Sequence, residues 1–552
     1  MLLAIWIKLA PSKVKRKVSQ LKARNVSQAI TPPRMIGTKV ACKNGTRIAL
    51  SHNPMKGGFF TSTLGFDDIP GYLPVSKKSD VVKNLAENWD VVVVGAGIAG
   101  CMTAGTIALK GKGNVSVLLM DRNPSTEAGK KTVLGWVCGD AVGEHHIKYI
   151  HEHIGTTYGK PEMENRVTAV YVYSPDMKVR VPFEGPGYVL DRPKFAKRLL
   201  DDALKAGVEF RGNVQATELI RDNGTIVGLY GQTVGPGVNQ PFEIRSKLII
   251  DTSGMSTKLR RNLPIPSHIE KEINKDDVEP TARLNAKLRD GVEVEPFHCD
   301  IYLDAEKAPG GYLWLFPKSE DKVNIGLGIQ QKRSPKPLSA LLKDWLAADD
   351  RFKDIQPLSD DSNLTGSWQV SVRHQNDCLV ANGYMICGDA AWFPNPISAG
   401  GIGPGLIGGV MAGEAAVRAI EANDFSEKQL WQYNLDFVNH YGNKTAGLEV
   451  FRMYLQTLNN DQINYGMRHF LSSDEATEIS LGEMPHLSAA KKIVKLFRGL
   501  GSYKAFSGLV FTMARMRALN ELYQNYPKDP GQFDAWKANV DSILAQGRAR
   551  FH

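Results

Sequence analysis

Three glycines have the spacing that lets a backbone turn around a dinucleotide. Gly95, Gly97 and Gly100 form a G-x-G-x-x-G motif directly after the valine-rich run 90–94. Glycines at these positions permit a tight turn and a close approach to a pyrophosphate, which then lies on the amide dipoles of the following helix. Asp121 follows Gly100 by 21 positions, where a carboxylate would bind the ribose hydroxyls. These residues predict a dinucleotide site.

The same glycine spacing recurs at Gly403, Gly405 and Gly408, but its surroundings differ. No strand pattern precedes this copy and no acid follows it at the right distance. It is therefore typical of a glycine-rich loop that enters a helix, and the chain encodes one nucleotide fold.

A second glycine-containing segment also fits cofactor chemistry. The stretch 384–387 is expected to form a strand that Gly388 and Asp389 end, so that the carboxylate meets a ribityl or ribose hydroxyl. Gly400 and Gly401 would bring backbone amides to the ligand at the start of a helix. Such a helix end would stabilise the anionic reduced ring of a flavin. An ordinary turn after a strand is the alternative, but the two segments together favour FAD over NAD.

Three aromatic residues alternate along one expected strand. Tyr312, Trp314 and Phe316 are two positions apart, so their side chains project to one face of a sheet. Such a face forms either the wall of a site or an ordinary core, and the spacing alone leaves both interpretations open.

The elements that position these residues are visible in the pattern. A strand at 115–120 follows the helix-compatible run 101–110, and a hairpin is expected at 168–183 around a turn at 174–177. The run 247–251 predicts a buried strand that returns the chain to the nucleotide sheet.

Over residues 88 to about 450 the chain resembles the FAD-dependent geranylgeranyl reductase family (digeranylgeranylglycerophospholipid reductase-like), within the hydroxylase-like flavoprotein class. The resemblance rests on these motifs: GAGIAG at 95–100, VCGDAV at 137–142, DRPKF at 191–195, DTSG at 251–254, GDAAWFPNPISAGGI at 388–402, and Y-x-W-x-F-P at 312–317 followed by G-x-G at 326–328. The last arrangement looks like the family's substrate-pocket signature.

The resemblance implies an α/β fold, in which a Rossmann-like FAD-binding fold is interleaved with an antiparallel-sheet substrate domain and followed by a C-terminal helical region. The expected boundaries are a basic N-terminal extension at 1–85, FAD-binding parts at 86–165, 186–280 and 371–425, a substrate-domain hairpin at 166–185, the substrate sheet at 281–370, and the helical domain at 426–552.

The resemblance also implies the site. The expected catalytic residues are Cys138, Tyr312 and Trp314, and the expected substrate pocket is formed by Tyr312, Trp314, Phe316 and Pro317. The expected FAD-binding residues are Gly95, Gly97, Ala99, Gly100, Asp121, Arg122, Cys138, Gly139, Arg192, Gly254, Gly388, Asp389, Pro396, Gly400, Gly401 and Ile402.

Cys138 corresponds to the family cysteine that lies near the flavin ring, where a thiol would contact the ring or relay a proton; inert packing is the alternative. The family often carries glutamate after Cys-Gly, whereas this chain has Asp140, and Asp121 likewise replaces the commoner glutamate. Arg192 looks like the family's cofactor-side arginine.

The implied activity is an FAD-dependent oxidoreductase that saturates carbon–carbon double bonds of geranylgeranyl or other polyprenyl chains in isoprenoid lipids or quinones. An external electron donor, NAD(P)H or a ferredoxin-like protein, is expected. The alternative is an FAD-dependent monooxygenase or halogenase on the same scaffold. Hydroxylases of this class tend to have Ala-Asp-Gly at the position of residues 251–254, and no tunnel lysine of a halogenase is identified. A third hypothesis is a non-enzymatic flavoprotein adaptor at a membrane.

The charge is concentrated at one end of the chain. Residues 1–66 contain twelve Lys or Arg and no Asp or Glu, although the formal net charge of the whole chain is only +10. We therefore expect no nucleic-acid groove across the body. The apolar run 1–10 and the lysine-rich run 13–24 favour peripheral contact with an anionic membrane, with a targeting peptide or a plain tail as alternatives. Six cysteines without C-x-x-C pairing indicate a reducing, cytoplasmic compartment and no zinc site.

Four histidines crowd the segment 143–155, at positions 145, 146, 151 and 153. His145 and His146 are adjacent and are expected to point apart on a helix, and no cysteine or carboxylate set completes a metal site. The segment is interpreted as a solvated helix face, with no metal.

Overall fold

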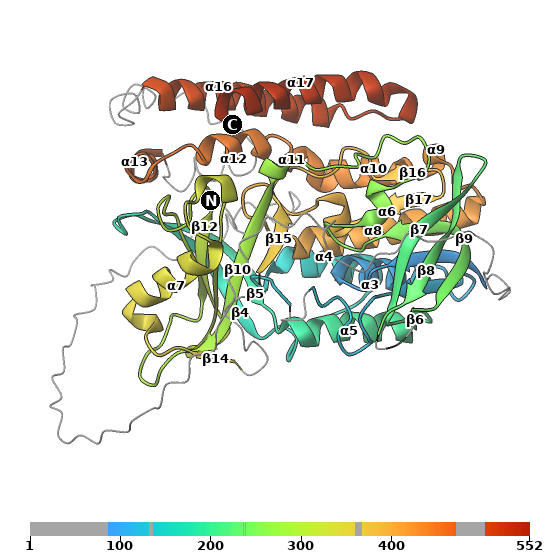
Figure 1. Cartoon of the computed structure of the whole chain (residues 1–552), viewed down its shortest axis with the longest axis horizontal. Helices are drawn as coiled ribbons and strands as arrows, with labels where there is room; N and C mark the ends of the chain where they lie inside the picture. The colour runs from blue at the N-terminus through green and yellow to red at the C-terminus, as the bar shows by residue number, and fades with distance from the viewer. Residues whose placement is uncertain (1–86, 132–135, 236, 238, 359–366, 471–502) are drawn as a thin grey trace, which may run out of the picture. The chain divides into compact units, whose positions relative to one another are not determined.

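Two β-sheets organise the chain in the computed structural model, which describes residues 87–131, 136–235, 237, 239–358, 367–470 and 503–552 (Figure 1). The basic extension expected at 1–85, with its membrane and targeting alternatives, lies outside the described residues. Among the described helices, none combines the length and the hydropathy needed to cross a membrane.

The first sheet has a parallel centre built on valine- and isoleucine-rich strands. Its order is β16 (Val380–Ala381), β17 (Tyr384–Ile386), β9 (Pro241–Asp251), β1 (Glu87–Val94), β2 (Val117–Met120) and β6 (Glu209–Arg211), with β7 (Val214–Asp222) and β8 (Thr225–Thr233) added through β9. Strands β17, β9, β1, β2 and β6 run parallel, and β16 is antiparallel to β17. A strand that is buried on both faces carries apolar residues at every position instead of alternating them with polar ones. Residues 91–94 of β1, all valine and all buried, show this pattern.

Helices α3 (Ile98–Lys110), α5 (Arg192–Lys205) and α8 (Ile402–Ala422) accompany this sheet. Helix α3 packs against both of the others. Its approach to α8 is close because α8 presents Gly413, where a Cβ would lie only 2.6 Å from Thr106 Cβ. This packing brings the first turns of α3 and α8 together at one end of the sheet.

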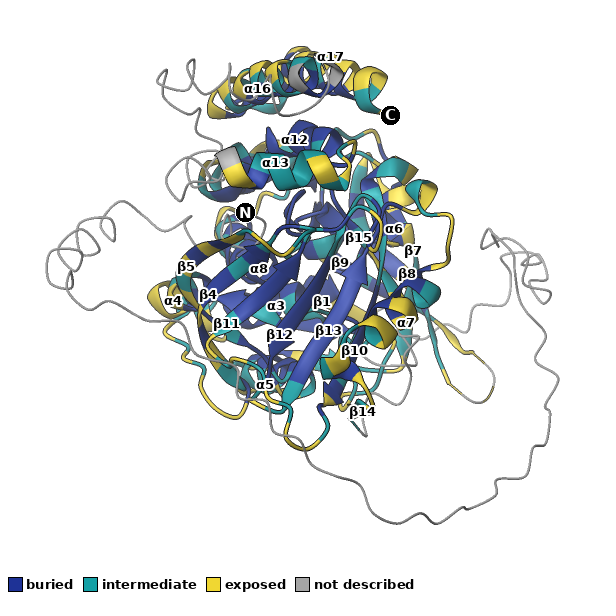
Figure 2. Cartoon of the chain, turned by 90° about the vertical axis from the view of Figure 1, so that its left-hand side faces the viewer, coloured by how far each residue is buried: buried dark blue, intermediate teal, exposed yellow. Residues whose placement is uncertain are grey.

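The second sheet differs on its two faces. Its order is β14 (Gln356–Pro357), β10 (Val278–Lys287), β13 (Lys322–Gly328), β12 (Tyr312–Pro317), β11 (His298–Tyr302), β4 (Asn165–Tyr173), β5 (Arg180–Val189) and β3 (Ala141–Gly143), with β15 (Ser367–Ser371) paired to β10. Leu284, Leu313 and Ile325 belong to an apolar cluster that α7 (Leu338–Ala348) completes on one face. The opposite face carries the aromatic residues of β12, and Figure 2 shows these central strands as buried.

The chain contributes strands to the two sheets alternately and does not complete one sheet before it begins the other. Strands β3 to β5 of the second sheet are inserted between β2 and β6 of the first. The prediction of an α/β fold with an interleaved second sheet and a C-terminal helical region is confirmed, as is the hairpin around residues 174–177. One detail differs: β4 and β11 are parallel, so the second sheet is mixed. The expected domain boundaries stay a prediction.

The remaining elements are helical. They are α4 (Glu144–Ile154), α6 (Lys258–Arg261), α9 (Glu427–Leu430), α10 (Gln432–Phe437), the π-helical turn η5 (Val438–Gly442), α11 (Asn443–Thr445), α12 (Leu448–Leu455), α13 (Asn460–Phe470), α16 (Tyr503–Gln524), α17 (Phe533–Phe551), and the 3-10 turns η1 (Lys275–Asp277), η2 (Gln331–Arg333), η3 (Asp350–Phe352), η4 (Gly388–Ala391) and η6 (Pro530–Gln532). Helices α16 and α17 pack on each other and on α12 (Figure 1).

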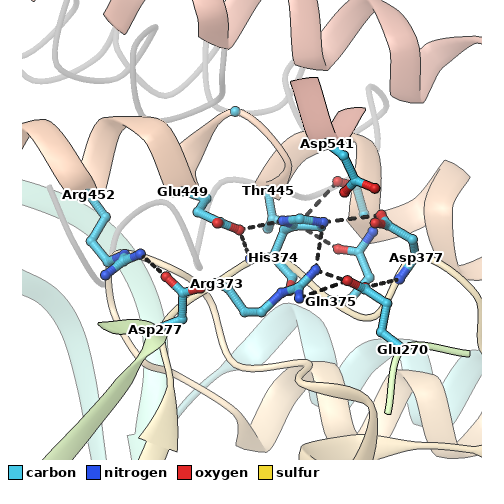
Figure 3. A network of polar contacts seen from close by, with 12 residues as sticks. Glu270, Asp277, Arg373, His374, Gln375, Asp377, Thr445, Glu449, Arg452 and Asp541 are labelled. Carbon is cyan, nitrogen blue, oxygen red and sulfur yellow. Dashed lines mark hydrogen bonds and ion pairs between the residues drawn. The ribbon is translucent and has the colours of Figure 1, made fainter. Parts of the chain in front are cut away.

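A buried ionic cluster fastens these C-terminal helices to the two sheets (Figure 3). At its centre, His374 Nδ1 lies 2.5 Å from Glu449 Oε2, and His374 Nε2 lies 3.1 Å from Asp377 Oδ1. Burial and the neighbouring Arg373 guanidinium would lower the pKa of His374, but Asp377 and Glu449 raise it overall to about 9. The ring is therefore an imidazolium held between two carboxylates at neutral pH.

Helix α17 supplies further cations to the same cluster. Lys537 Nζ lies 2.8 Å from Asp377 Oδ2, and Arg548 bonds both Glu449 Oε1 at 2.9 Å and Asp277 Oδ2 at 2.8 Å. Buried carboxylates are tolerated only when opposite charges and hydrogen bonds satisfy them. The cluster therefore couples the stability of α17 to that of the sheets.

We expect the free energy of unfolding to decrease between pH 6.5 and pH 9. The pKa of His374 is higher in the folded than in the unfolded chain, so its stabilisation is complete below 6.5 and is lost as pH rises through 9. The size of the loss is up to about 3 kcal/mol. Urea unfolding followed by circular dichroism at several pH values measures it. A His151→Gln control on the exposed side of α4 should keep the slope, whereas a His374→Gln variant with an unchanged slope would contradict the assignment.

Candidate active site

The first glycine motif forms the turn between β1 and α3. Gly95 has φ of +103°, and a Cβ there would lie 2.7 Å from the Thr252 carbonyl oxygen. A Cβ at Gly100 would lie 1.8 Å from the Gly95 carbonyl oxygen, so this glycine permits the helix to approach the strand. A Cβ at Gly97, in contrast, would meet no protein atom within 4 Å. That open position, at a helix start without a side-chain cap, suits the close approach of a phosphate group.

Asp121 is placed beside this turn at the end of β2. Its Oδ2 accepts a hydrogen bond from the Ala96 amide at 2.7 Å, and its Oδ1 accepts one from the Asn123 amide at 2.8 Å. Burial raises the pKa of Asp121, and these amides oppose the rise. The carboxyl group is thus fixed against the glycine turn, a contact that the sequence spacing did not reveal.

The second glycine segment lies next to the first. A Cβ at Gly388 would be 2.7 Å from Ala99 Cβ, which places the strand end of β17 against the first turn of α3. Asp389 Oδ2 is 2.9 Å from Lys131 Nζ. Gly401 precedes the first turn of α8, which has no side-chain cap and no acidic residue. Two helix N-termini with unsatisfied amides therefore meet in one place.

Arg192 is a buried cation with unused hydrogen-bond donors. It opens α5, is 6% exposed, and its Nε and Nη1 atoms have no partner among the described residues. The Leu190 amide donates to the Asp140 carbonyl at 2.9 Å. This hydrogen bond ties the chain just before Arg192 to the Cys-Gly-Asp segment. Buried donors without partners are rare in native proteins, and a bound polar ligand would satisfy them.

The aromatic residues of β12 do share one face of the sheet. Ring centroids of Trp314 lie 6.3 Å from those of both Tyr312 and Phe316. Trp314 is 7% exposed and Phe316 4%. A Cβ at Gly139 would lie 3.1 Å from Phe316 Cε2, and Tyr312 Oη donates to the Ser398 carbonyl at 2.5 Å. The rings thus contact the Cys-Gly-Asp segment at one end and the loop before α8 at the other.

A polar group beneath these rings was missed by the sequence analysis. Asn324 accepts from Trp314 Nε1 at 2.9 Å and donates to the Cys138 carbonyl at 2.9 Å and to Asp140 Oδ2 at 2.7 Å. Lys318 Nζ lies 3.5 Å from Asp140 Oδ2 and 2.7 Å from Glu164 Oε2. Burial would lower the pKa of Lys318, but Asp140 and Glu164 raise it overall. The only signal in the sequence was that Asn324 lies within an apolar strand and that Lys318 directly follows one.

Three expected site residues differ from the others in exposure, side-chain direction or surroundings. Arg122 is exposed and donates to the Lys131 carbonyl at 2.7 Å. Pro317 follows Phe316, so strand alternation turns its side chain away from the aromatic face. Gly254 has φ of +93°, and a Cβ there would meet no protein atom within 4 Å. The roles assigned to the individual site residues stay predictions.

The interpretation of the histidine segment was wrong for one pair. His146 is buried rather than solvated, and its ring centroid lies 3.8 Å from that of His145, so the two rings do not point apart. A Cβ at Gly403 would be 2.2 Å from His146 Nε2, so this ring fills the space beside α8. Burial lowers the pKa of His145 to about 3. No group of three or more metal-binding side chains occurs among the described residues.

Together, these residues supply hydrogen-bond donors and acceptors that fit FAD. The open position at Gly97 and the two uncapped helix starts suit a pyrophosphate and the flavin pyrimidine edge. Asp121 and Asp389 offer carboxyl groups for hydroxyls, and Arg192 offers the unused donors described above.

Comparison with known proteins gives consistent results. The family model described as the geranylgeranyl reductase catalytic domain matches residues 277–359. The chain is 32% identical over 464 residues to digeranylgeranylglycerophospholipid reductase of Sulfolobus acidocaldarius, covering 83% of this chain and 98% of that protein. It is 32% identical over 361 residues to digeranylgeranylglycerophospholipid reductase 2 of Methanococcoides burtonii, covering 63% of this chain and 80% of that protein.

Solved structures show the same fold. A geranylgeranyl bacteriochlorophyll reductase-like protein from Thermoplasma acidophilum superposes with a TM-score of 0.63 at 24% identity, over 74% of this chain and 100% of that chain. The myxobacterial chondrochloren halogenase, an FAD-dependent halogenase, superposes with a TM-score of 0.56 at 16% identity, over 79% of this chain and 97% of that chain. Both likenesses concern the fold alone.

Two alanine substitutions in the glycine motif should separate ligand binding from folding. We expect Gly97→Ala to fold normally but to bind FAD at least tenfold more weakly, a loss of about 1.4 kcal/mol, because the added methyl group enters the space that a phosphate would take. Gly100→Ala should instead lower the unfolding temperature or the soluble yield, because its methyl group collides with backbone. Flavin fluorescence titration and thermal unfolding measure the two effects. Normal FAD affinity in folded Gly97→Ala would contradict this placement.

Proposed function

Because the chain belongs to the digeranylgeranylglycerophospholipid reductase family, we propose that it is an FAD-dependent reductase that saturates carbon–carbon double bonds in geranylgeranyl or other polyprenyl chains. One observation carries the proposal for this chain. The aromatic face of β12 lies against the Cys-Gly-Asp segment and, through Tyr312, against the loop before α8, where the cofactor-type residues gather. An apolar chain and a flavin would thus share one site.

The chain's own residues would hold the cofactor in the following way. The amides around Gly97 and Gly401 would bind its phosphates and pyrimidine edge, Asp121 and Asp389 its hydroxyl groups, and Arg192 would donate from its free Nε and Nη1. Reduced FAD, when bound, supplies a hydride. Lys131 now pairs with Asp389, so we expect it to release this carboxylate or to share it with the ligand.

The aromatic face would serve the reaction in two ways. An isolated double bond has no adjacent carbonyl group to accept the negative charge that a hydride brings. A proton must therefore be delivered to the less substituted carbon together with the hydride, and positive charge develops at the more substituted carbon, which receives the hydride. The rings of Tyr312, Trp314 and Phe316 would keep water away and stabilise this charge through their π-faces. The bond from Trp314 Nε1 to Asn324 fixes one ring, and the bond from Tyr312 Oη to Ser398 fixes another.

Three finer points belong to the same proposal. The Cys138 thiol, half-buried in the Cys-Gly-Asp segment, would lie beside the reacting face. An external donor, NAD(P)H or a ferredoxin-like protein, would reduce the flavin. The lysine-rich N-terminal run would bring the enzyme to an anionic membrane surface where its lipid substrate resides.

A direct test uses the purified chain with FAD. Reduction with dithionite without oxygen, followed by addition of a geranylgeranylated glycerophospholipid, should add two hydrogen atoms per reduced double bond, which mass spectrometry detects. Protein stripped of FAD is the control. A product that forms only with dioxygen would favour the monooxygenase or halogenase alternative, whose fold this chain shares. Bound flavin without any conversion would support the non-enzymatic adaptor instead.

Two tryptophans of equal burial provide a matched pair of variants. Trp314 and Trp345 are each 7% exposed, but Trp314 is on the aromatic face and Trp345 packs in the apolar cluster on the other face. We expect Trp314→Leu to lower turnover about tenfold or more, since a desolvated cation–π contact contributes up to about 2 kcal/mol. Trp345→Leu should lower stability while turnover per folded molecule stays within about twofold. Equal turnover in the two variants would contradict the role of the face.

A further inference from the structure

Resting on the proposed function, we propose that Glu279 is the proton source for the reduction: its carboxyl group protonates one carbon of the double bond while the other carbon receives the hydride. The π bond breaks and two C–H bonds form. The flavin is oxidised, the alkene is reduced, and Glu279 becomes a carboxylate that regains its proton from water. Glu279 belongs to none of the motifs that indicated the site.

Glu279 projects to the aromatic face of the second sheet. In the register of β10, β13 and β12, Thr281 pairs with Gly328, and Gly328 pairs with Tyr312. Paired residues share a face, and residues two positions apart in a strand share it too. Glu279 therefore lies on the same face as Tyr312, opposite the apolar cluster under α7.

The second glycine of the G-x-G motif leaves a gap between these two side chains. A Cβ at Gly328 would lie 3.9 Å from Glu279 Oε2 and 3.3 Å from Thr281 Cγ2, so the carboxyl oxygen reaches over this position. Gly326 has a different role, because the Trp314 ring already fills its space, 2.4 Å from where a Cβ would be. The motif thus packs one ring at Gly326 and has the buried carboxyl group of Glu279 next to Gly328.

The surroundings of Glu279 suit a proton donor. It is 6% exposed, and its Oε1 accepts from Gln456 Nε2 at 2.6 Å. Arg452 is the cation nearby, but it is committed to Asp277 Oδ1 at 2.5 Å (Figure 3). Arg548 also pairs with Asp277. A buried carboxyl group without a cation of its own keeps its proton more readily than an exposed one.

The charges that face Glu279 determine its titration. Burial raises the pKa of Glu279 to about 7, although Arg452 and the Gln456 hydrogen bond act in the opposite direction and Asp277 adds to the rise. Tyr312 is the titratable group facing it across the gap; burial and Glu279 together raise the pKa of that hydroxyl. A general acid works best with a pKa near the operating pH, a condition that Glu279 meets and Tyr312 does not.

Two of the other groups that could donate a proton, Tyr312 and Asp140, are engaged in bonds elsewhere. Tyr312 Oη already donates to the Ser398 carbonyl at 2.5 Å. Asp140 is bonded by Asn324 at 2.7 Å and lies 3.5 Å from the Lys318 ammonium group, an arrangement that orients a carboxylate. Asp140 is also buried, but the Lys318 cation lies beside it, whereas the hydrogen-bond partner of Glu279 is the neutral Gln456.

The principal test is Glu279→Gln, which keeps the shape and the Gln456 contact but removes the acidic proton. With FAD reduced by dithionite and a geranylgeranylated lipid, we expect wild-type turnover to fall as pH rises through about 7. Turnover of Glu279→Gln should be at least tenfold lower at pH 6.5, without that pH dependence and without a solvent deuterium isotope effect, while FAD content is unchanged. Glu414→Gln, at a partly buried glutamate of α8 that pairs with Lys110, is the control.

A second variant leaves Glu279 in place. Gln456→Met removes the hydrogen bond that lowers the pKa of Glu279, so the alkaline fall in turnover should move up by roughly half to one pH unit. A profile that is unchanged or moves down overturns the proposal, as does wild-type turnover in Glu279→Gln. If the wild-type enzyme itself does not reduce the lipid, the proposed function fails, and this outcome is distinct from activity that is independent of Glu279.

Discussion

The arrangement of the site depends on the close contact between a backbone and a ring at Gly139. The Cys-Gly-Asp segment leaves the first sheet after β2, enters the second sheet at β3, and lies on Phe316 and Trp314 on its way. A Cβ at Gly139 would be 3.1 Å from Phe316 Cε2, so a side chain there would require the segment or the ring to shift by a few tenths of an ångström. The same segment is held by Asn324, which donates to the Cys138 carbonyl and to Asp140, so the contact at Gly139 and these bonds together fix the segment against the rings.

The second sheet assigns different tasks to its two faces. The face under α7 is predominantly apolar and supplies stability mainly by burial. The other face combines aromatic rings with a small number of polar side chains, each of which has a specific partner: Asn324 holds Trp314, Ser398 holds Tyr312, and Gln456 holds Glu279. Polar groups satisfied in this way limit the positions that the rings can adopt. The face thus combines aromatic rings with polar groups held in fixed positions, the two properties that the proposed function requires of it.

The sequence was informative where function requires a local pattern. The valine run before Gly95 and the alternation of rings in β12 predicted the turn and the shared face, and the motifs identified the family. The ribose contact predicted for Asp121 from its spacing stays a prediction. These features depend on residues close together in the chain.

Other features depend on contacts between distant segments and left no readable signal. The burial of His146 against Gly403, the placement of Lys318 beside Glu164, and the position of Glu279 opposite Tyr312 each require the tertiary fold. The ionic cluster of His374 is similar, because its partners come from α12 and α17. Periodicity indicated helices in this region, but it could not show which of their charged residues are buried.

The strand order of the first sheet has a consequence for biosynthesis. Its central strand β1 lies between β2, which leaves the ribosome soon afterwards, and β9, which is more than a hundred residues further along the chain. Strand β17 joins later still, after most of the second sheet has been translated. A nascent chain therefore exposes one edge of β1 for much of its synthesis, an edge to which other chains can attach. Cells that produce this protein would benefit from a chaperone that shields this edge until β9 emerges.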